Sequence, residues 1–287
     1  MKHPLPKVSI VILSKNGGDS FKRLIREIFN QKIDINYEII IIDSGSTDSA
    51  LSEIKNYPVR LFQIRPEEFK FGSVRDLGFS KARGEYIVTL SQDAIPADEK
   101  WLLNLISPFA DPSIAAVQGV ELKPDTSDIF FWEKVGRFYF SREHDRWLRE
   151  YDGIGLSFVN AAIRREIWQK YKFGDVPMSE DKIFQKRLKE NGHRIYLAEG
   201  AGVYHWHDYN LRTLIKRCEN EGLGWRYAGV NYTLVDVLLD ILGYKKYITL
   251  LKGILHGRVR SMTEVLFPLI RPVFLYMGNT FSTSYKF

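Results

Sequence analysis

The sequence of 287 residues has a single cysteine, Cys218, and no long apolar segment. One cysteine excludes an internal disulfide framework and is typical of a reducing compartment. No stretch approaches the roughly 20 apolar residues that a bilayer span requires. Near the N-terminus, the apolar run Val8 to Leu13 is short and stops at polar residues, unlike a secretory signal. We therefore expect a cytoplasmic protein, or one bound to a membrane from one side.

Acidic residues are nearly absent from the last part of the chain. Residues 241–287 contain seven Lys or Arg and one acid, Glu264, so this segment accounts for the net charge of +6 of the whole protein. Apolar residues between these cations predict amphipathic helices. We favour contact with the anionic inner face of a cell membrane. The alternatives are packing against the rest of the chain or against a second copy in a homodimer. No nucleic-acid-binding module is recognisable.

The first hundred residues alternate apolar, β-branched runs with amphipathic helical segments. This alternation predicts an α/β fold, with a mostly parallel, Rossmann-like sheet between layers of helices. From about residue 230 onward the pattern is helical. We therefore expect an α/β domain over residues 1–229 and a basic helical extension over residues 230–287. The strands expected are 8–13, 38–42, 59–64, 86–90, 115–121, 157–162, 194–197 and 203–205.

Polar residues follow several of these strands. Asp93 comes soon after one buried strand, and Asp43 with Ser44 follows another. Open α/β sheets bind ligands at the carboxyl ends of their strands. Asp93 is therefore a candidate ligand for a divalent cation, although a turn aspartate before a proline is the simpler alternative. His205 and His207 lie two residues apart at a predicted strand end and so face the same side, where they could complete a metal shell or be exposed loop residues.

Five motifs stand at residues 8–16, 43–48, 71–78, 91–94 and 180–181. Together, in this order, they resemble glycosyltransferase family 2, which has the GT-A fold. The form Ser91-Gln92-Asp93-Ala94 and the later His205-Trp206-His207 resemble the bacterial rhamnosyltransferase branch of that family. The resemblance covers residues 6–210 and does not extend into the C-terminal part.

The resemblance implies sugar transfer from a nucleoside diphosphate to a hydroxyl group. Asp181 would be the catalytic base, in the first turn of a helix where the macrodipole favours an anion. Glu180 beside it would bind the acceptor, and Asn160 would lie near the acceptor or the donor sugar. The alternative for the two acids is that both only cap the helix.

A divalent cation, Mg²⁺ or Mn²⁺, would bind at Asp93 with His205 and His207 and act on the leaving diphosphate. Arg75 would contact the diphosphate and add positive charge. Gln92 stands where many relatives carry an acid, so we expect the metal to bind weakly and together with the donor. The residues expected at the nucleotide sugar are Ser14, Asn16, Asp43, Ser44, Arg75, Gln92 and Asp93.

These roles imply an inverting, metal-dependent enzyme that moves L-rhamnose from dTDP-L-rhamnose to a lipid-linked oligosaccharide. Its product would belong to a bacterial surface polysaccharide (O-antigen, capsule or cell wall), made at the inner membrane surface. One alternative is transfer of N-acetylglucosamine, glucose or galactose from a UDP-sugar. An alternative of another class is a non-catalytic, membrane-associated scaffold, which Gln92 in place of an acid would suit. The presence of Asp93, Arg75, Asp181 and His205 together argues for the enzyme.

Overall fold

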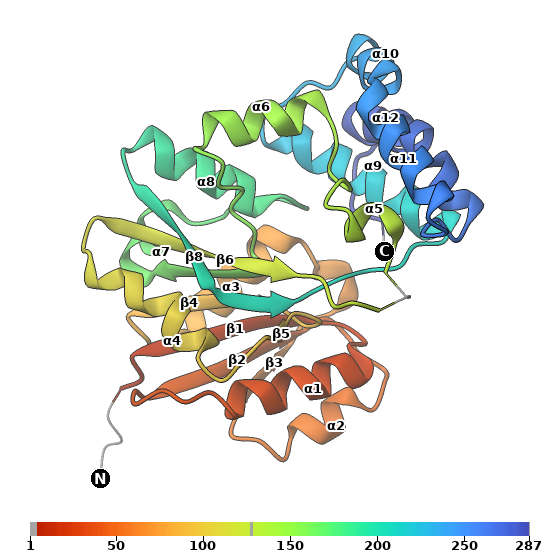
Figure 1. Cartoon of the computed structure of the whole chain (residues 1–287). Coiled ribbons are helices and arrows are strands. Elements are labelled where there is room, and N and C mark those ends of the chain that lie inside the picture. The colour runs from red at the N-terminus through yellow and green to blue at the C-terminus, as the bar shows by residue number, and fades with distance from the viewer. Residues whose placement is uncertain (1–4, 127–128, 287) are drawn as a thin grey trace. The chain divides into compact units, whose positions relative to one another are not determined.

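The computed structural model of the chain describes residues 5–126 and 129–286 (Figure 1). These residues form two compact units. The first unit comprises residues 5–122, 154–176 and 180–205, and the second comprises the remainder. The separate role of residues 230–287 as a helical extension stays a prediction.

A mixed eight-stranded sheet forms the centre of the first unit, in the order β3-β2-β1-β4-β7-β6-β8-β5. Six strands share one direction, whereas β7 and β5 run against their neighbours. The strands are β1 (Val8–Ser14), β2 (Tyr37–Asp43), β3 (Arg60–Gln63), β4 (Tyr86–Ser91), β5 (Ile95–Pro96), β6 (Ile114–Leu122), β7 (Asn160–Arg164) and β8 (Arg194–Tyr204).

Strand β2 shows why this sheet needs helices on both faces. Ile39 and Ile41 belong to one apolar core and Ile40 and Ile42 to the other, so the run of isoleucines is buried on both sides. The first core includes residues of α1 and α4, and the second includes residues of α3, α7 and α8. The helices of this unit are α1 (Gly18–Phe29), α2 (Ala50–Ile54), α3 (Phe71–Lys81), α4 (Trp101–Ile106), α7 (Arg165–Tyr171) and α8 (Glu180–Glu190).

The prediction of two short strands at 194–197 and 203–205 is wrong, because β8 is continuous from Arg194 to Tyr204. Its pairing with β6 is irregular between Leu197 and Gly202, where four residues of β8 face a single residue of β6. Such an irregularity interrupts the period-two alternation by which strands are recognised in a sequence.

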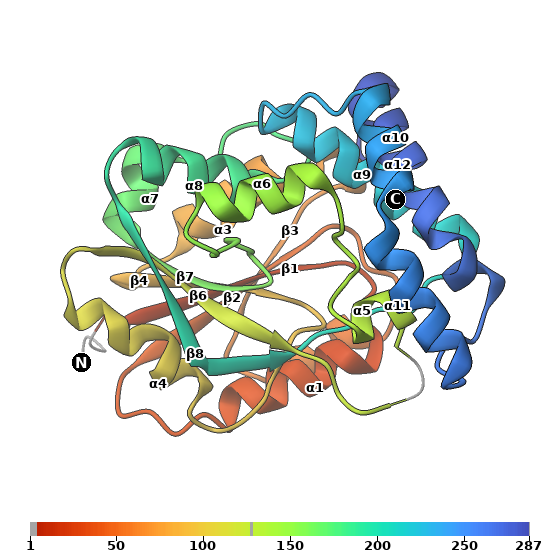
Figure 2. The ribbon, with the colours of Figure 1, turned by 45° about the horizontal axis from the view of Figure 1, so that its top comes forward.

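The second unit is helical, and α12 packs against α9, α10 and α11, which lie side by side in both views (Figure 2). Helices α10 and α12 each begin with a capping box, formed by Thr233 with Asp236 and by Ser261 with Glu264. In the part of the chain that the structure describes, none of the helices has the length and hydropathy of a membrane span. The helices are α5 (Phe131–Lys134), α6 (Arg142–Glu150), α9 (Leu211–Tyr227), α10 (Leu234–Leu242), α11 (Tyr244–Leu255) and α12 (Met262–Phe281).

Candidate active site

The carboxyl ends of the six co-directional strands lie along one edge of the sheet. The register aligns Ser14 of β1 with Asp43 of β2 and places Leu13 opposite Ser91 of β4. Farther along the same edge, β6 and β8 end together at Leu122 and Tyr204. The edge therefore brings together the predicted residues that follow β1, β2, β4 and β8, as expected for a ligand site in an α/β sheet.

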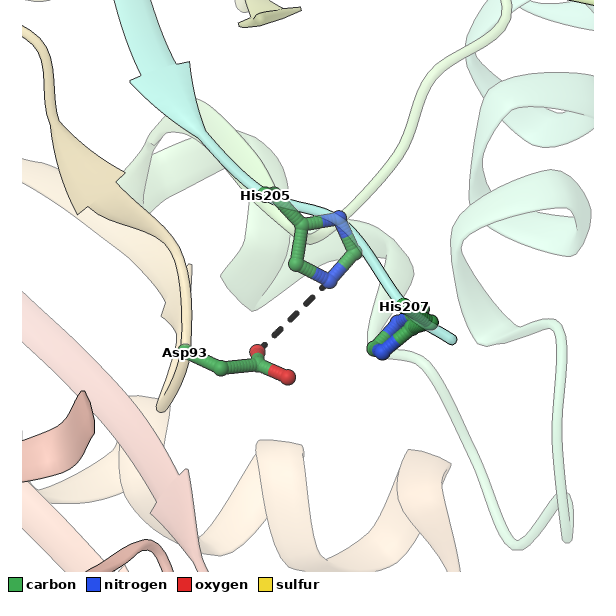
Figure 3. A group of neighbouring side chains, drawn as sticks. All are labelled: Asp93, His205 and His207. Atoms are coloured by element: carbon green, nitrogen blue, oxygen red, sulfur yellow. Dashed lines mark ion pairs between the residues drawn. The ribbon is translucent and has the colours of Figure 1, made fainter. Parts of the chain in front are cut away.

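The short strand β5 explains how Asp93 meets His205. Ile95 of β5 pairs with Tyr204, so the loop before β5 runs beside the end of β8. Asp93 Oδ1 lies 3.6 Å from His205 Nε2. Asp93, His205 and His207 each offer one ligand atom, and these atoms lie within 4.8 Å of one another (Figure 3). One carboxylate oxygen and two imidazole nitrogens fit a divalent ion such as Mn²⁺.

Glu121 orients His205 and was missed by the sequence analysis. Its Oε2 lies 2.8 Å from His205 Nδ1. When Glu121 is ionised it accepts a hydrogen bond from the Nδ1–H group, so the proton stays on Nδ1 and the Nε2 lone pair is directed at Asp93. Glu121 is the next-to-last residue of β6. Glu121 could have been predicted by the criterion that selected Asp43 and Asp93, because it too is an acid at the carboxyl end of a strand.

Glu121→Ala should weaken Mn²⁺ binding by about 10- to 100-fold, because the imidazole loses the carboxylate that fixes its orientation. Glu121→Gln, which keeps an acceptor oxygen, should lose less. Electron paramagnetic resonance of free Mn²⁺, titrated with protein and dTDP, measures the affinity without turnover. Glu199→Ala, an exposed acid on β8, is the matched control. If Glu199→Ala lost as much Mn²⁺ affinity as Glu121→Ala, the cause would be the change in net surface charge and not the orientation of His205.

The loops after β1 and β2 form a tightly bonded pair. Asp43 accepts hydrogen bonds from the N–H groups of Gly45 (3.1 Å) and Ser46 (3.0 Å), and Asn16 Oδ1 accepts one from Thr47 N–H (2.8 Å). Within residues 5–126 and 129–286, the Ser14 hydroxyl is the only buried side-chain oxygen or nitrogen without a hydrogen-bond partner. Binding of a nucleotide by these loops stays a prediction.

Gln92 ties the loop after β4 to the loop after β1. Its Oε1 accepts a hydrogen bond from Lys15 N–H at 2.9 Å, and its Nε2 donates one to the Lys15 carbonyl at 3.1 Å. A carboxylate could accept the first bond but could not donate the second. An amide at position 92 is therefore explained by these two hydrogen bonds, one of which needs a donor.

Arg75 and Glu180 form an ion pair inside the first unit. Arg75 is 6% exposed; its Nε donates to Glu180 Oε1 at 2.8 Å, and its guanidinium also bonds Thr89 and stacks on Phe158. Glu180 is 4% exposed. Burial raises the pKa of the Glu180 carboxyl above its usual range, and the Arg75 guanidinium opposes that shift. The structure thus shows an interior ion pair, and the contacts of Arg75 with the diphosphate and of Glu180 with the acceptor stay predictions.

Asn160 is bonded inside the sheet, and its predicted place near a sugar stays a prediction. The residue is fully buried. Its Oδ1 accepts a hydrogen bond from Trp101 Nε1 at 3.0 Å, and its Nδ2 donates to the carbonyls of Val120 and Ala201. Both amide hydrogens are thus used within the sheet, because a buried donor without a partner would be costly.

Asp181 differs from its buried neighbour in being partly exposed. It lies in the first turn of α8 and accepts a hydrogen bond from Lys182 N–H at 2.7 Å. Ser179, just before α8, has a φ of 60°, and Asn16 has a φ of 48°. Non-glycine residues in this left-handed region are uncommon and concentrate at functional sites. Ser179 thus lies two residues before Asp181, and Asn16 is itself a predicted site residue.

Comparison with known proteins agrees with this geometry. The sequence model of Glycosyl transferase family 2 matches residues 9–172. The O-antigen chain rhamnosyltransferase RfbN of Salmonella typhimurium is 28% identical over 228 residues, which cover 76% of this chain and 72% of that protein. The resemblance expected from the motifs is confirmed.

Solved structures share the fold. The mannosyltransferase PcManGT from Pyrobaculum calidifontis, in complex with GDP-Man and Mn²⁺, superposes with a TM-score of 0.64 at 14% identity, over 97% of this chain and 88% of that one. Glucosyl-3-phosphoglycerate synthase from Mycobacterium tuberculosis, in complex with Mn²⁺, UDP and glucosyl-3-phosphoglycerate, gives 0.62 at 19% identity, over 78% and 81%. The predicted GT-A fold, with helices at the C-terminal end of the chain, is confirmed.

Proposed function

Because the chain belongs to glycosyl transferase family 2, we propose that it transfers L-rhamnose from dTDP-L-rhamnose to a hydroxyl of a lipid-linked oligosaccharide. The reaction inverts the anomeric centre and extends a bacterial surface polysaccharide at the inner face of the cell membrane. The proximity of Asp93 to His205, at the edge where the nucleotide loops end, carries the proposal. The match to an O-antigen rhamnosyltransferase along most of the chain supports the choice of sugar.

Different residues at this edge of the sheet bind the nucleotide and the metal ion. Ser14 and Asn16, with the turn that begins at Asp43, receive the nucleotide, and the unpaired Ser14 hydroxyl supplies one hydrogen bond to it. Asp93, His205 and His207 would hold Mg²⁺ or Mn²⁺ beside the diphosphate. The ion, when bound, neutralises charge on the departing diphosphate.

Asp181 takes the proton of the acceptor hydroxyl as that oxygen attacks the anomeric carbon. Its carboxylate is partly exposed in the first turn of α8, where an acceptor hydroxyl can reach it. One displacement with one base gives inversion, since no covalent intermediate with the protein is formed.

The test is a donor panel with purified protein and Mn²⁺: dTDP-L-rhamnose, UDP-N-acetylglucosamine, UDP-glucose and UDP-galactose. A true donor at 100 times its Kd should stabilise the folded protein by about 2.7 kcal/mol in a thermal-shift assay. We expect dTDP-L-rhamnose to give the largest shift and slow release of dTDP, which EDTA abolishes.

Each other result of the panel has a defined meaning. A larger shift with a UDP-sugar would replace rhamnose by that sugar. No shift and no release with any donor would favour a non-catalytic scaffold. Release that is indifferent to EDTA would contradict the metal role of Asp93 and the histidines.

A further inference from the structure

Helix α10 buries an acidic residue and exposes apolar ones. A surface helix normally buries its apolar residues and exposes its polar ones. In α10 the buried positions are Val237 and Asp240. Asp240 accepts hydrogen bonds from Arg142 N–H at 3.0 Å and from the Tyr232 hydroxyl at 2.5 Å. The exposed positions are all apolar: Leu234, Val235, Leu238, Leu239 and Leu242.

Helices α11 and α12, which follow α10 in the chain, also expose apolar residues. The exposed apolar residues of α12 are three or four positions apart, so they form one stripe along the helix. Apolar exposure on three consecutive helices exceeds the scattered single residues that are normal on a protein surface. The exposed residues are Tyr244, Tyr247, Ile248, Leu251, Ile254 and Leu255 on α11, and Met262, Leu266, Leu269, Val273, Met277 and Phe281 on α12.

The exposed charge on this part of the chain has one sign. Among residues 230–286, Asp240 and Glu264 are buried and Asp236 is engaged in capping α10, so no acid is fully exposed. Lys245 and Lys252 are exposed on α11 and lie two turns apart, hence on the same side of the helix.

Not every cation of the basic segment contributes to that surface. Lys246 is buried and donates to main-chain carbonyls, including that of Gly243 at 2.8 Å. Arg271 is buried as well and pairs with Glu221 at 2.6 Å. Arg258 is exposed beyond the end of α11. Arg260 and Lys286 are exposed but pair with acids, Arg260 with Asp208 at 3.5 Å and Lys286 with Glu219 at 2.7 Å. Lys245, Lys252 and Arg258 are therefore the exposed cations that we expect to meet an anionic partner.

We propose that the α10–α12 surface, defined by the exposed apolar residues named above, lies on an anionic lipid bilayer. The apolar side chains enter the head-group region, and Lys245, Lys252 and Arg258 contact lipid phosphates. A second copy of the chain fits less well, since it would bring the same positive charge to the same face. This inference deepens the proposed function and rests on it only for the lipid-linked acceptor that gives the docking a purpose.

The experiment is cosedimentation of the full chain with vesicles of phosphatidylglycerol and phosphatidylcholine, and with phosphatidylcholine alone. We expect binding to the anionic vesicles that weakens with added salt. Lys245→Gln with Lys252→Gln should lower the partition coefficient by about fivefold for each lysine. Leu238→Ser with Leu251→Ser should lower it by at least about tenfold.

Matched variants on the first unit provide the controls: Lys186→Gln with Lys189→Gln on α8, and Leu103→Ser with Leu197→Ser, all at exposed positions. They should bind vesicles like the unchanged protein. Analytical ultracentrifugation of every variant tests for self-association. Unchanged vesicle binding in the α10–α12 variants, or conversion of a dimer to a monomer by them, would overturn the proposal. Donor-dependent release of dTDP without vesicles is a separate readout, so failure here leaves the proposed reaction standing.

Discussion

Asp181→Asn should lower the rate of sugar transfer by about 100- to 10,000-fold, the usual contribution of a general base. Asparagine preserves the size of the side chain and an acceptor oxygen for Lys182 N–H, but it cannot take a proton at neutral pH. Since Asp181 is partly exposed and close to the start of α8, the substitution should leave the fold intact. Release of dTDP in the presence of membranes that carry the acceptor measures the loss.

Two further measurements make the Asp181 test specific. Affinity for dTDP-L-rhamnose, measured by calorimetry with Mn²⁺, should be unchanged, because the base acts on the acceptor. Glu190→Gln, at the other end of the same helix and exposed, should retain full activity. A full rate in Asp181→Asn would remove the residue from the role of base, and a parallel loss of donor affinity would place it at the donor instead.

Glu180→Ala should destabilise the protein by about 3–5 kcal/mol, because it leaves the Arg75 guanidinium buried without its carboxylate partner. The two side chains are 7% and 5% exposed and lie 2.8 Å apart. Such a loss should lower the thermal midpoint by roughly 10 °C in a unit of this size. Differential scanning calorimetry at pH 7 measures it. Neighbouring acids on α8 are thus expected to have opposite phenotypes, one in catalysis and one in stability.

The control for Glu180→Ala is the double variant Arg75→Met with Glu180→Leu. Replacement of a buried ion pair by apolar side chains of similar volume is often nearly neutral. Thr89 keeps a hydrogen bond in that variant, since its hydroxyl also donates to the Phe158 carbonyl at 3.1 Å. The double variant should therefore recover most of the lost stability. If the double variant were as unstable as Glu180→Ala, the loss of stability would come from altered packing at the start of α8 and not from the broken ion pair.

The parts of the fold that the sequence predicted are those with strong local patterns. The isoleucine run of β2 has the composition of a strand buried on both faces, and it occupies that position. Asp93 and His205 were placed near each other by their positions after strands and by family resemblance, and they lie 3.6 Å apart. Local pattern and strand order together were enough for these features.

The parts that could not be predicted depend on contacts between distant segments. Glu121 and His205 are separated by 84 positions, and Arg75 and Glu180 by 105. No local pattern predicts such pairs. The first depends on the irregular pairing of β6 with β8, and the second on the packing of α3 and α8 on the same face of the sheet. Phe130, Trp132 and Phe138 likewise pack in a core of the second unit with Phe267, a partner far along the chain.

Two hydrogen bonds between Gln92 and the main chain of Lys15 join the loop after β4 to the loop after β1. One of these loops carries Asn16, expected at the nucleotide, and the other carries Asp93, expected at the metal. A ligand that orders either loop thereby removes part of the entropy that ordering of the other would cost. Donor and cation then become thermodynamically linked ligands, and each must raise the affinity of the other by the same factor.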